Sequence, residues 1–383
     1  PLKPVVFKYF KVSDLWGTIN GRPRFELQHN RQGSVETVKA ILRIPVQKRG
    51  QFITLQRTYV ETLNGALEYD QKNDYGHIAN LQFAVSVFPF VKTEGLKQYN
   101  VQLIDRALGV WQQSKLSLAF FNNGYKNEVD EKQIIQRDRS LKREKNVGSK
   151  YYRVRAAFDY MVLTLSNEQG ATLADGVICP RWQSYVSGHD AFTFAVDFGT
   201  TNTHLECMRN DEEPEPLKIE NPARDRLMAT LYNGESILYD VIMKQEFLPK
   251  LIGADYGFPQ RTVLSEAGAM DAESADMIIA LGDANIPFIY EKESIGYGNN
   301  IVPNLKWSTE MATSKRVKAY LTEIAQLMRT KVLLANGDLS KTRIVWFYPL
   351  AMKVGNVNKL GDMWAKTVAE VFGITVDSSN LIA

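Results

Sequence analysis

The sequence predicts a mixed α+β protein, in which a β-rich region over residues 1–190 precedes an α/β region over residues 191–383. Two observations predict this division. In residues 1–120, short stretches alternate apolar and polar positions between turn residues, a pattern typical of β-strands. Towards the end of the chain, apolar residues recur at helical spacing on either side of an apolar run, Arg343 to Pro349, which favours a strand buried on both faces.

The strands of the β-rich region follow from the alternation. They are predicted at Phe52 to Gln56, Leu81 to Phe88, Val101 to Ile104, Leu116 to Phe121, Tyr151 to Phe158, Tyr160 to Leu165 and Gly176 to Cys179. A helix is expected near Ser34 to Ile44. Residues 126–150 are dense in charge of both signs, which is typical of a solvated linker or exposed helix, with a partner-binding or regulatory loop as the alternative. We expect residues 1–190 to form an accessory region of one or two domains.

The α/β region contains two predicted helices, one before and one after the apolar run. Helical spacing relates Val317, Tyr320, Leu321, Ile324, Leu327 and Met328 in the first, and Val357, Leu360, Met363, Trp364, Val368, Val371 and Phe372 in the second. Large apolar residues at such spacing are typical of a core-facing stripe. We therefore expect both helices to pack on a sheet.

Composition indicates a folded chain without a strong charge. The 383 residues predict two or three domains. Hydrophobic residues make up 44% and charged residues 23%, both near the values for globular domains. Because 46 basic and 43 acidic residues leave a net charge of only +3, neither nucleic acid nor an anionic membrane is expected as a partner.

The cysteine count and the absence of long apolar runs suggest where the protein works. Cys179 and Cys207 are too few for a disulfide framework, and no Cys/His cluster shows metal-ligand spacing. No apolar run reaches the roughly 18 residues of a membrane span, and the first residues lack a signal pattern. The expected location is the reducing cytoplasm, with no membrane partner.

The segment Phe194 to Thr203 contains the strongest functional signal. An apolar strand there ends at Asp197, and a tight turn follows, formed by Gly199, Thr200, Thr201 and Asn202. Glycine lets the backbone approach an anion, successive amide groups can form an anion-binding nest, and a carboxylate can hold hydrated Mg²⁺. The alternative is a β-hairpin whose Asp, Gly, Thr and Asn are simply good turn formers.

The run Asp197 to Thr203, Asp-Phe-Gly-Thr-Thr-Asn-Thr, closely resembles the first phosphate motif of the superfamily that joins actin, the sugar kinases and the 70-kDa heat-shock chaperones. It is closest to the chaperone form. The resemblance covers residues 191–383 and implies the first lobe of an actin-like ATPase, with a ribonuclease-H-like α/β fold. It implies that Leu217 to Asn221 is the third strand of the sheet and Phe258 to Leu264 the next strand. It also implies a chain truncated before the second lobe, with half of an ATP site.

The resemblance also assigns roles to single residues. Asp197 would orient magnesium-bound water, as both a metal-binding and a catalytic residue. The residues implied to contact the β- and γ-phosphates are Gly199, Thr200, Thr201 and Asn202. Lys306 would lie near the γ-phosphate as a second catalytic residue, and the alternative is a surface lysine ahead of a helix. His204 follows the motif directly, but strand alternation is expected to turn it away from the phosphates.

On this resemblance, the expected function is an ATP-binding and ATP-hydrolysing chaperone-like module with an added β-rich interaction region. Its cofactors would be ATP and Mg²⁺, and its partners the nucleotide and protein clients or co-chaperone-like proteins. Phosphoryl transfer to water depends mainly on positioning and charge stabilisation, which a turn, a metal and a lysine can supply. Two alternatives stay open: an actin-like scaffold with weak or lost hydrolysis, and a small-molecule kinase of the same superfamily.

Overall fold

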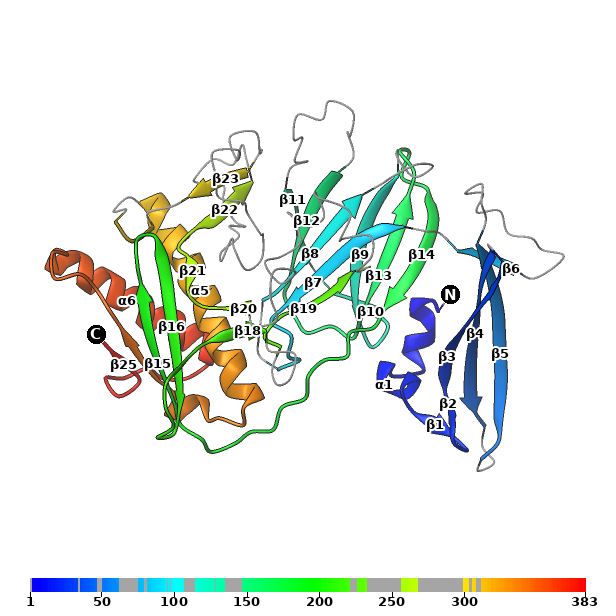
Figure 1. Cartoon of the computed structure of the whole chain (residues 1–383), viewed down its shortest axis with the longest axis horizontal. Helices are drawn as coiled ribbons and strands as arrows, with labels where there is room; N and C mark the ends of the chain where they lie inside the picture. Colours follow the sequence, from blue (N-terminus) through cyan, green and yellow to red (C-terminus); the bar gives the residue numbers. More distant parts are fainter. Residues whose placement is uncertain are drawn as a thin grey trace. The chain divides into compact units, whose positions relative to one another are not determined.

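The chain divides into two compact units, each assembled from separate stretches of sequence (Figure 1). Unit 1 consists of Pro1–Gln82, Asp105–Glu128 and Phe158–Arg181, and unit 2 of Phe83–Ile104, Val129–Ala157 and Trp182–Ala383. The computed structural model describes residues 2–33, 35–46, 50–61, 75–78, 81–94, 96, 98–106, 114–127, 129–134, 147–220, 226–232, 256–267, 299–302, 305–307 and 311–383.

Unit 1 contains two four-stranded sheets in its described part. The first has β3 (Phe25–Gln32), β4 (Val35–Pro45) and β5 (Phe52–Glu61) antiparallel to one another, with β6 (Tyr75–Ile78) parallel to β5. The second has the order β10-β9-β13-β14, from β10 (Tyr125–Lys126), β9 (Lys115–Asn122), β13 (Tyr160–Ser166) and β14 (Thr172–Ile178). In the second sheet, β9 buries alternate residues, whereas the central strand β13 is buried on both faces.

A helical N-terminal segment packs into unit 1. It comprises the 3-10 helix η1 (Pro4–Lys8), the short helix α1 (Val12–Leu15) and the hairpin of β1 (Thr18–Ile19) and β2 (Arg22–Pro23). Phe7 and Leu15 are buried with Tyr160 and Val162 of β13. The rings of Phe7 and Tyr160 lie 4.2 Å apart, and the Tyr160 hydroxyl donates a hydrogen bond of 3.3 Å to the Pro4 carbonyl. These contacts fix the segment against the second sheet.

Unit 2 begins with a five-stranded sheet of order β11-β12-β8-β7-β19. Its strands are β7 (Gln82–Phe88), β8 (Tyr99–Arg106), β11 (Val129–Ile134), β12 (Val147–Val154) and β19 (Ala229–Tyr232). Polar contacts join it to helix α5 (Met311–Leu334). Asn100 donates a hydrogen bond of 2.6 Å to Glu323, and Arg329 donates one of 3.1 Å to Thr93.

The six-stranded sheet of unit 2 mixes parallel and antiparallel pairs. β15 (Phe192–Phe198) pairs antiparallel with β16 (Asn202–Arg209), which also pairs with β17 (Glu215–Pro216) and β21 (Gln260–Arg261). On its other edge, β15 runs parallel to β24 (Arg343–Trp346), and β24 runs parallel to β25 (Leu381–Ile382). The carboxyl ends of β15 and β24 therefore meet at one edge of this sheet.

One face of this sheet is buried against α5 and α6 (Val354–Phe372). Alternate residues of β15, from Phe192 to Phe198, are buried together with Ile344 and Trp346 of β24. Trp364 of α6 is fully buried in the same cluster. The helices predicted from apolar spacing are thus confirmed, and their stripes cover the sheet as expected.

The remaining described elements are short. β18 (Lys218–Glu220) pairs with β20 (Tyr256–Gly257), and β22 (Leu264–Ala267) pairs with β23 (Asn299–Val302). Two 3-10 helices, η5 (Leu305–Trp307) and η6 (Leu339–Lys341), precede α5 and β24 respectively.

The fold class predicted from the sequence is wrong. The described residues form three α-helices and seven sheets, most of them antiparallel, so the protein is mostly β and not an α/β ribonuclease-H-like lobe behind a β-rich region. The segment Leu217 to Asn221, expected as the third strand of the hairpin sheet, contributes β18 to a separate two-stranded sheet. Local spacing predicted the helices correctly, but it could not show which strands pair with one another.

The predicted helix near Ser34 to Ile44 is also wrong. These residues form β4, which pairs with β3 on one side and β5 on the other. Valine, threonine and isoleucine recur through the segment, and these β-branched residues favour strands. The predicted strands of the first half are confirmed in β5, β7, β8, β9, β12, β13 and β14. In the charged stretch 126–150, β11 and β12 pair with each other, while residues 135–146 lie outside the described residues.

Candidate functional site

The turn between β15 and β16 lies where the carboxyl ends of two parallel strands meet. β15 ends at Phe198, and the neighbouring β24 ends at Trp346. The Phe347 amide donates a hydrogen bond of 3.1 Å to the Val196 carbonyl, so the chain beyond β24 stays beside β15. In sheets with parallel strands, this carboxyl edge is where ligands commonly bind.

Glycine is required in this turn because the chain folds back on itself there. The Gly199 amide donates a hydrogen bond of 3.0 Å to the Asp197 carbonyl. A Cβ atom at Gly199 would lie 2.2 Å from the Asn202 carbonyl oxygen, far inside van der Waals contact. Asp197, Thr201 and Asn202 are exposed, and Gly199 is half-buried. The turn therefore presents a carboxylate and polar groups to solvent on a constrained backbone.

Buried hydroxyl groups anchor the turn to the core of unit 2. Thr203 Oγ1 lies 2.9 Å from Thr262 Oγ1 and accepts a hydrogen bond of 2.9 Å from the Tyr320 hydroxyl of α5. All three residues are fully buried. The Thr262 amide donates a hydrogen bond of 2.8 Å to the Thr201 carbonyl, inside the turn itself. The exposed face of the turn is thus held by a buried polar contact on its other side.

Lys306 lies near enough to Asp197 for their charges to interact. η5 positions Lys306, and the preceding Leu305 is buried in the core of unit 2. The Lys306 Nζ lies 5.8 Å from the centre of the Phe198 ring. Burial lowers the pKa of Lys306, and the nearby Asp197 carboxylate opposes that shift. Lys306 is half-buried and precedes α5, and its role as a catalytic residue stays a prediction.

His204 lies on the same face of the sheet as Asp197. The two residues are direct partners in the β15–β16 register, and cross-strand partners share a face. The expectation that His204 faces away from bound phosphates stays a prediction. Its Nε2 lies 3.1 Å from Glu206 Oε1 on the same strand, so a carboxylate already contacts this imidazole.

Asp197 is the carboxylate that the turn itself offers to a metal ion. Across the described ranges, no group of three or more His, Cys, Asp or Glu residues could hold a metal ion. Mg²⁺ usually binds through one or two carboxylates, waters and substrate phosphates. The exposed Asp197, the glycine-constrained turn and the half-buried Lys306 are compatible with that kind of site.

The sequence did not predict that two aromatic residues at this edge, Phe347 and Tyr348, are partly exposed. The apolar run from Arg343 predicts a fully buried strand, but Phe347 exposes 49% of its surface and Tyr348 39%. The rings of Trp346 and Tyr348 lie 5.5 Å apart. β24 ends at Trp346, before the apolar run does. The signal in the sequence is Pro349, because proline cannot continue a strand's hydrogen bonds.

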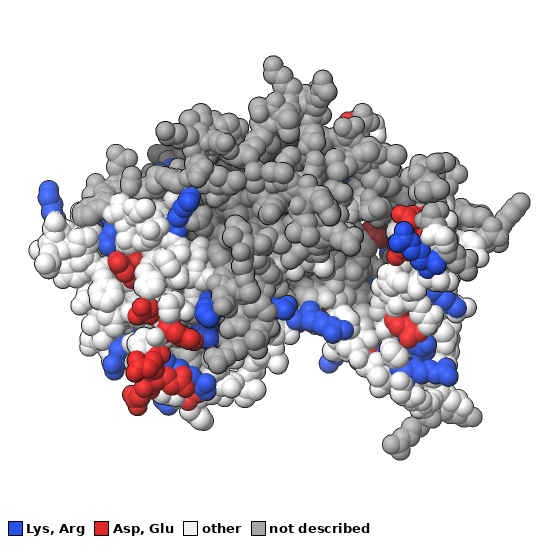
Figure 2. All heavy atoms as spheres, viewed as in Figure 1, with Lys and Arg blue, Asp and Glu red and all other residues white. Residues whose placement is uncertain are grey.

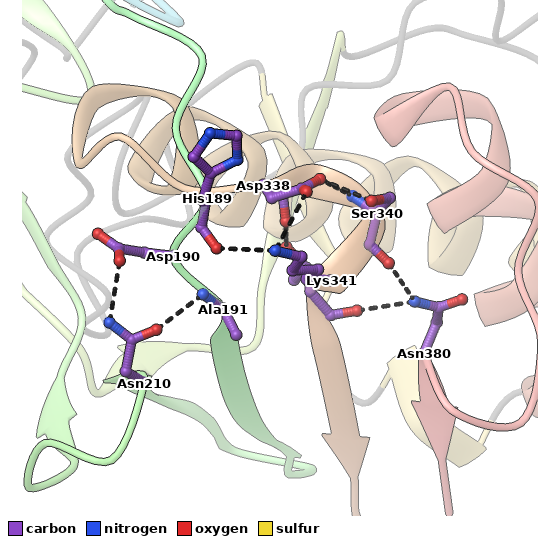
Figure 3. A network of polar contacts seen from close by, with 9 residues as sticks. His189, Asp190, Ala191, Asn210, Asp338, Ser340, Lys341 and Asn380 are labelled. Carbon is purple, nitrogen blue, oxygen red and sulfur yellow. Dashed lines mark hydrogen bonds and ion pairs between the residues drawn. The ribbon is translucent and has the colours of Figure 1, made fainter.

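The opposite end of the same strands holds a network of polar contacts (Figure 3). Asn210 donates a hydrogen bond of 3.0 Å to Asp190 and accepts one of 2.9 Å from the Ala191 amide. Asn380 donates hydrogen bonds of 3.1 Å to the carbonyls of Ser340 and Thr342. These contacts close the turns at the amino ends of β15 and β24, so their role is to fix the register of the sheet.

Acidic side chains also gather at this far end. Asp211, Glu212 and Glu213, between β16 and β17, are exposed. Figure 2 shows acidic groups clustered over that part of unit 2. β16 runs antiparallel to β15, so its last residue, Arg209, lies beside the amino end of β15. This acidic cluster therefore lies at the other end of the strands from the Asp197 turn. At that distance, it does not place its negative charge beside a phosphate bound at the turn.

The comparisons with known proteins give no support to the resemblance. No family model, curated protein or solved structure matches the chain. Together with the strand-rich architecture, this result contradicts membership in the actin, sugar kinase and heat-shock chaperone superfamily. The motif Asp197 to Thr203 forms the turn of the β15–β16 hairpin. Both the phosphate-site interpretation and the alternative of simple turn formers expect this hairpin, so the roles of its residues stay predictions. In the part of the chain that the structure describes, no helix is both long and apolar enough to cross a membrane.

Proposed function

We propose that the Asp197 turn binds the phosphate groups of ATP together with Mg²⁺. The observation that supports this most directly is the proximity of the exposed Asp197 carboxylate to the half-buried Lys306 across a turn that only glycine can form. The proposal concerns the chemistry of this site alone, and it does not depend on membership in any protein family.

The anion would be held by the turn backbone and by Lys306. The Gly199 amide already donates to the Asp197 carbonyl, so the other amide groups of the turn would contact the phosphate oxygens. Lys306 has lost part of its hydration, since burial already lowers its pKa. A polyphosphate beside it would supply the negative charge that favours the protonated ammonium.

The metal would join Asp197 to the ligand. A single carboxylate suits Mg²⁺ when phosphate oxygens and waters complete the coordination. Asp197 and the turn hydroxyls would then orient water near the terminal phosphate, which is the positioning that hydrolysis requires. The ATP hydrolysis expected from the sequence is proposed on this basis.

Calorimetric titration with Mg-ATP, Mg-ADP and AMP tests the proposal. Affinity is expected to fall from ATP to AMP, because the contacts are made to phosphates. Lys306→Met is expected to weaken Mg-ATP binding by about 1.5–3 kcal/mol, the usual contribution of a hydrogen bond to a charged group.

Lys315→Met is the matched control, since Lys315 is exposed on α5 and its loss changes the net charge equally. It should bind Mg-ATP as the wild type does. Equal affinity of Lys306→Met and Lys315→Met, or no saturable binding of Mg-ATP by the wild type, would refute the proposal.

A further inference from the structure

A cavity of about 630 Å³ lies within unit 1. Its walls come from the N-terminal helical segment, the strands β3, β4 and β5, and the end of β14. Pockets for small molecules commonly measure about 300–1,000 Å³ and are lined mostly by apolar side chains. Most residues around this cavity are apolar, so both its size and its lining fit that class.

The strand register explains why the lining is apolar. Phe25 of β3 pairs with Leu42 of β4, which pairs with Leu55 of β5. Leu27 pairs in the same way with Ala40. Because cross-strand partners share a face, these side chains form one continuous apolar surface on the sheet. That surface is the floor of the cavity.

The cavity stays open because the helical segment beside it is attached to the second sheet. The Phe7–Tyr160 ring contact holds η1 on the second sheet, and the Lys3 ammonium pairs with Asp175 of β14. Protein interiors normally pack with few voids. Here Val5, Leu27 and Leu55 line the cavity yet expose 56%, 51% and 53% of their surfaces. This apolar area is available to a ligand.

Both charged residues that line the described part of the cavity are basic, and one of them, Lys3, is paired with Asp175. Lys3 and Arg57 are among its lining residues, and none of the described lining residues is acidic. Arg57 lies directly across from Ala40 in the β4–β5 register, so it stands on the apolar face itself. Its guanidinium lies 5.7 Å from the centre of the Tyr59 ring. A cation within an apolar surface is suited to a ligand that combines an apolar body with an anionic group.

We propose that this cavity binds a long-chain alkyl carboxylate, with the chain on the apolar sheet face and the carboxylate at Arg57. The Arg57 guanidinium supplies paired N–H donors that match the two carboxylate oxygens. The alkyl chain gains by leaving water for the surface formed by Leu27, Leu42 and Leu55. This site is independent of the proposed phosphate site in unit 2.

Calorimetric titration of the full chain with decanoate, dodecanoate and dodecyltrimethylammonium tests this proposal. Dodecanoate should bind on the order of tenfold more tightly than decanoate, because each buried methylene contributes about fourfold in affinity. Arg57→Gln should weaken dodecanoate binding about tenfold or more and should not weaken binding of the cationic amphiphile. Lys39→Gln is the matched control, because Lys39 precedes Ala40 in β4 and points to the other face of the sheet.

Ala40→Phe provides the second variant, since a phenyl group at the centre of the floor fills the cavity and should abolish dodecanoate binding. If this variant does not fold, as judged by its melting curve, the comparison of Arg57→Gln with Lys39→Gln decides. The proposal is overturned if dodecanoate does not bind saturably, or if the Arg57 and Lys39 variants bind it equally. A dimer in light scattering that binds no carboxylate and is broken by Ala40→Phe would identify a second copy of the chain as the occupant, which also overturns it.

Discussion

The Tyr320 hydroxyl donates a hydrogen bond of 2.9 Å to Thr203 Oγ1, and this contact joins helix α5 to the end of the Asp197 turn. Both residues are fully buried, and the Tyr320 ring lies 5.5 Å from the Phe198 ring. Helix α5, more than a hundred residues away in the sequence, therefore contacts the buried side of the turn and holds its exposed residues in place. The shape of the candidate site depends on this tertiary contact as much as on the motif itself.

Tyr320→Phe is expected to lower the free energy of unfolding by about 0.5–1.5 kcal/mol, the usual net contribution of a hydrogen bond. The phenyl ring keeps the contact with Phe198, and Thr203 keeps its partner Thr262. Urea unfolding measures the change. Tyr348→Phe, at an exposed position, should change stability by no more than about 0.5 kcal/mol. Equal stability of the two variants would show that the buried contact contributes nothing.

Gly199→Ala is expected to disturb the turn, because the added Cβ would lie 2.2 Å from a backbone oxygen. Relief of that clash requires a backbone shift, with a cost of about 1–3 kcal/mol in unfolding free energy and loss of Mg-ATP binding. Gly355→Ala in α6 is the control, since no atom lies within 4 Å of its added Cβ. It should be neutral or stabilising by up to about 1 kcal/mol. A Gly199→Ala protein that unfolds and binds like the wild type would contradict the steric argument.

Elements with a strong local pattern were predictable from the sequence. The strand from Leu81 to Phe88 and the helices around Tyr320 and Trp364 are confirmed, because alternation and helical spacing report burial along one element. β4 was predicted as a helix although its valine, threonine and isoleucine residues favour a strand, and it pairs with the strands just before and after it in the sequence. The fold class failed for a different reason, because pairing between distant strands, such as β7 with β19 and β15 with β24, leaves no local pattern.

The candidate site was predictable in its turn but not in its surroundings. Asp197 and Gly199 belong to a run of residues that favour turns, and the structure confirms a tight turn there. The roles assigned to these residues in nucleotide binding stay predictions. The position of His204 beside Asp197 follows from the hairpin register. A turn longer or shorter by one residue would move the side chains of one strand to the opposite face of the sheet, so the sequence alone did not determine this position.

The polar network at the amino ends of β15 and β24 predicts a pH dependence of stability. Hydrogen bonds from Asn210 and Arg209 lower the pKa of Asp190, and hydrogen bonds from Ser340 lower that of Asp338. A carboxyl group with a lower pKa in the folded state stabilises the fold above its unfolded pKa of about 3.9. That stability is lost as the pH falls through the folded pKa. The free energy of unfolding should therefore decrease as the pH is lowered below about 5.

Asn210→Gly isolates one of these contacts. Asn210 has a φ of 51°, which glycine adopts without strain, so the variant removes the side chain and keeps the turn. Its unfolding free energy should vary less steeply with acid pH than that of the wild type. Asn123→Gly, at a φ of 49° in unit 1, is the matched control and should keep the wild-type pH profile. Identical profiles for the two variants would contradict the assignment.

Cys179 is expected to react slowly with alkylating reagents. Burial raises the pKa of its thiol to about 11, and Asp159 adds to the shift. Since only the thiolate reacts, alkylation by iodoacetamide at pH 8 should be on the order of a hundredfold slower than for a free cysteine with a pKa of about 8.5. Mass spectrometry of the Cys179 peptide gives the rate, and the urea-unfolded chain is the reference. A native rate equal to the unfolded rate would contradict this environment.

The dependence of ATP affinity on Mg²⁺ in the Asp197→Asn variant tests the central claim most directly. Asparagine is nearly isosteric with aspartate and suits the same turn, so the variant should keep the wild-type melting temperature. Calorimetry should show that Mg²⁺ strengthens ATP binding by the wild type and by Asp211→Asn, an exposed aspartate between β16 and β17. In Asp197→Asn, that strengthening should be lost. If Asp197→Asn keeps both its melting temperature and the wild-type response to Mg²⁺, the Asp197 turn is not a magnesium–phosphate site.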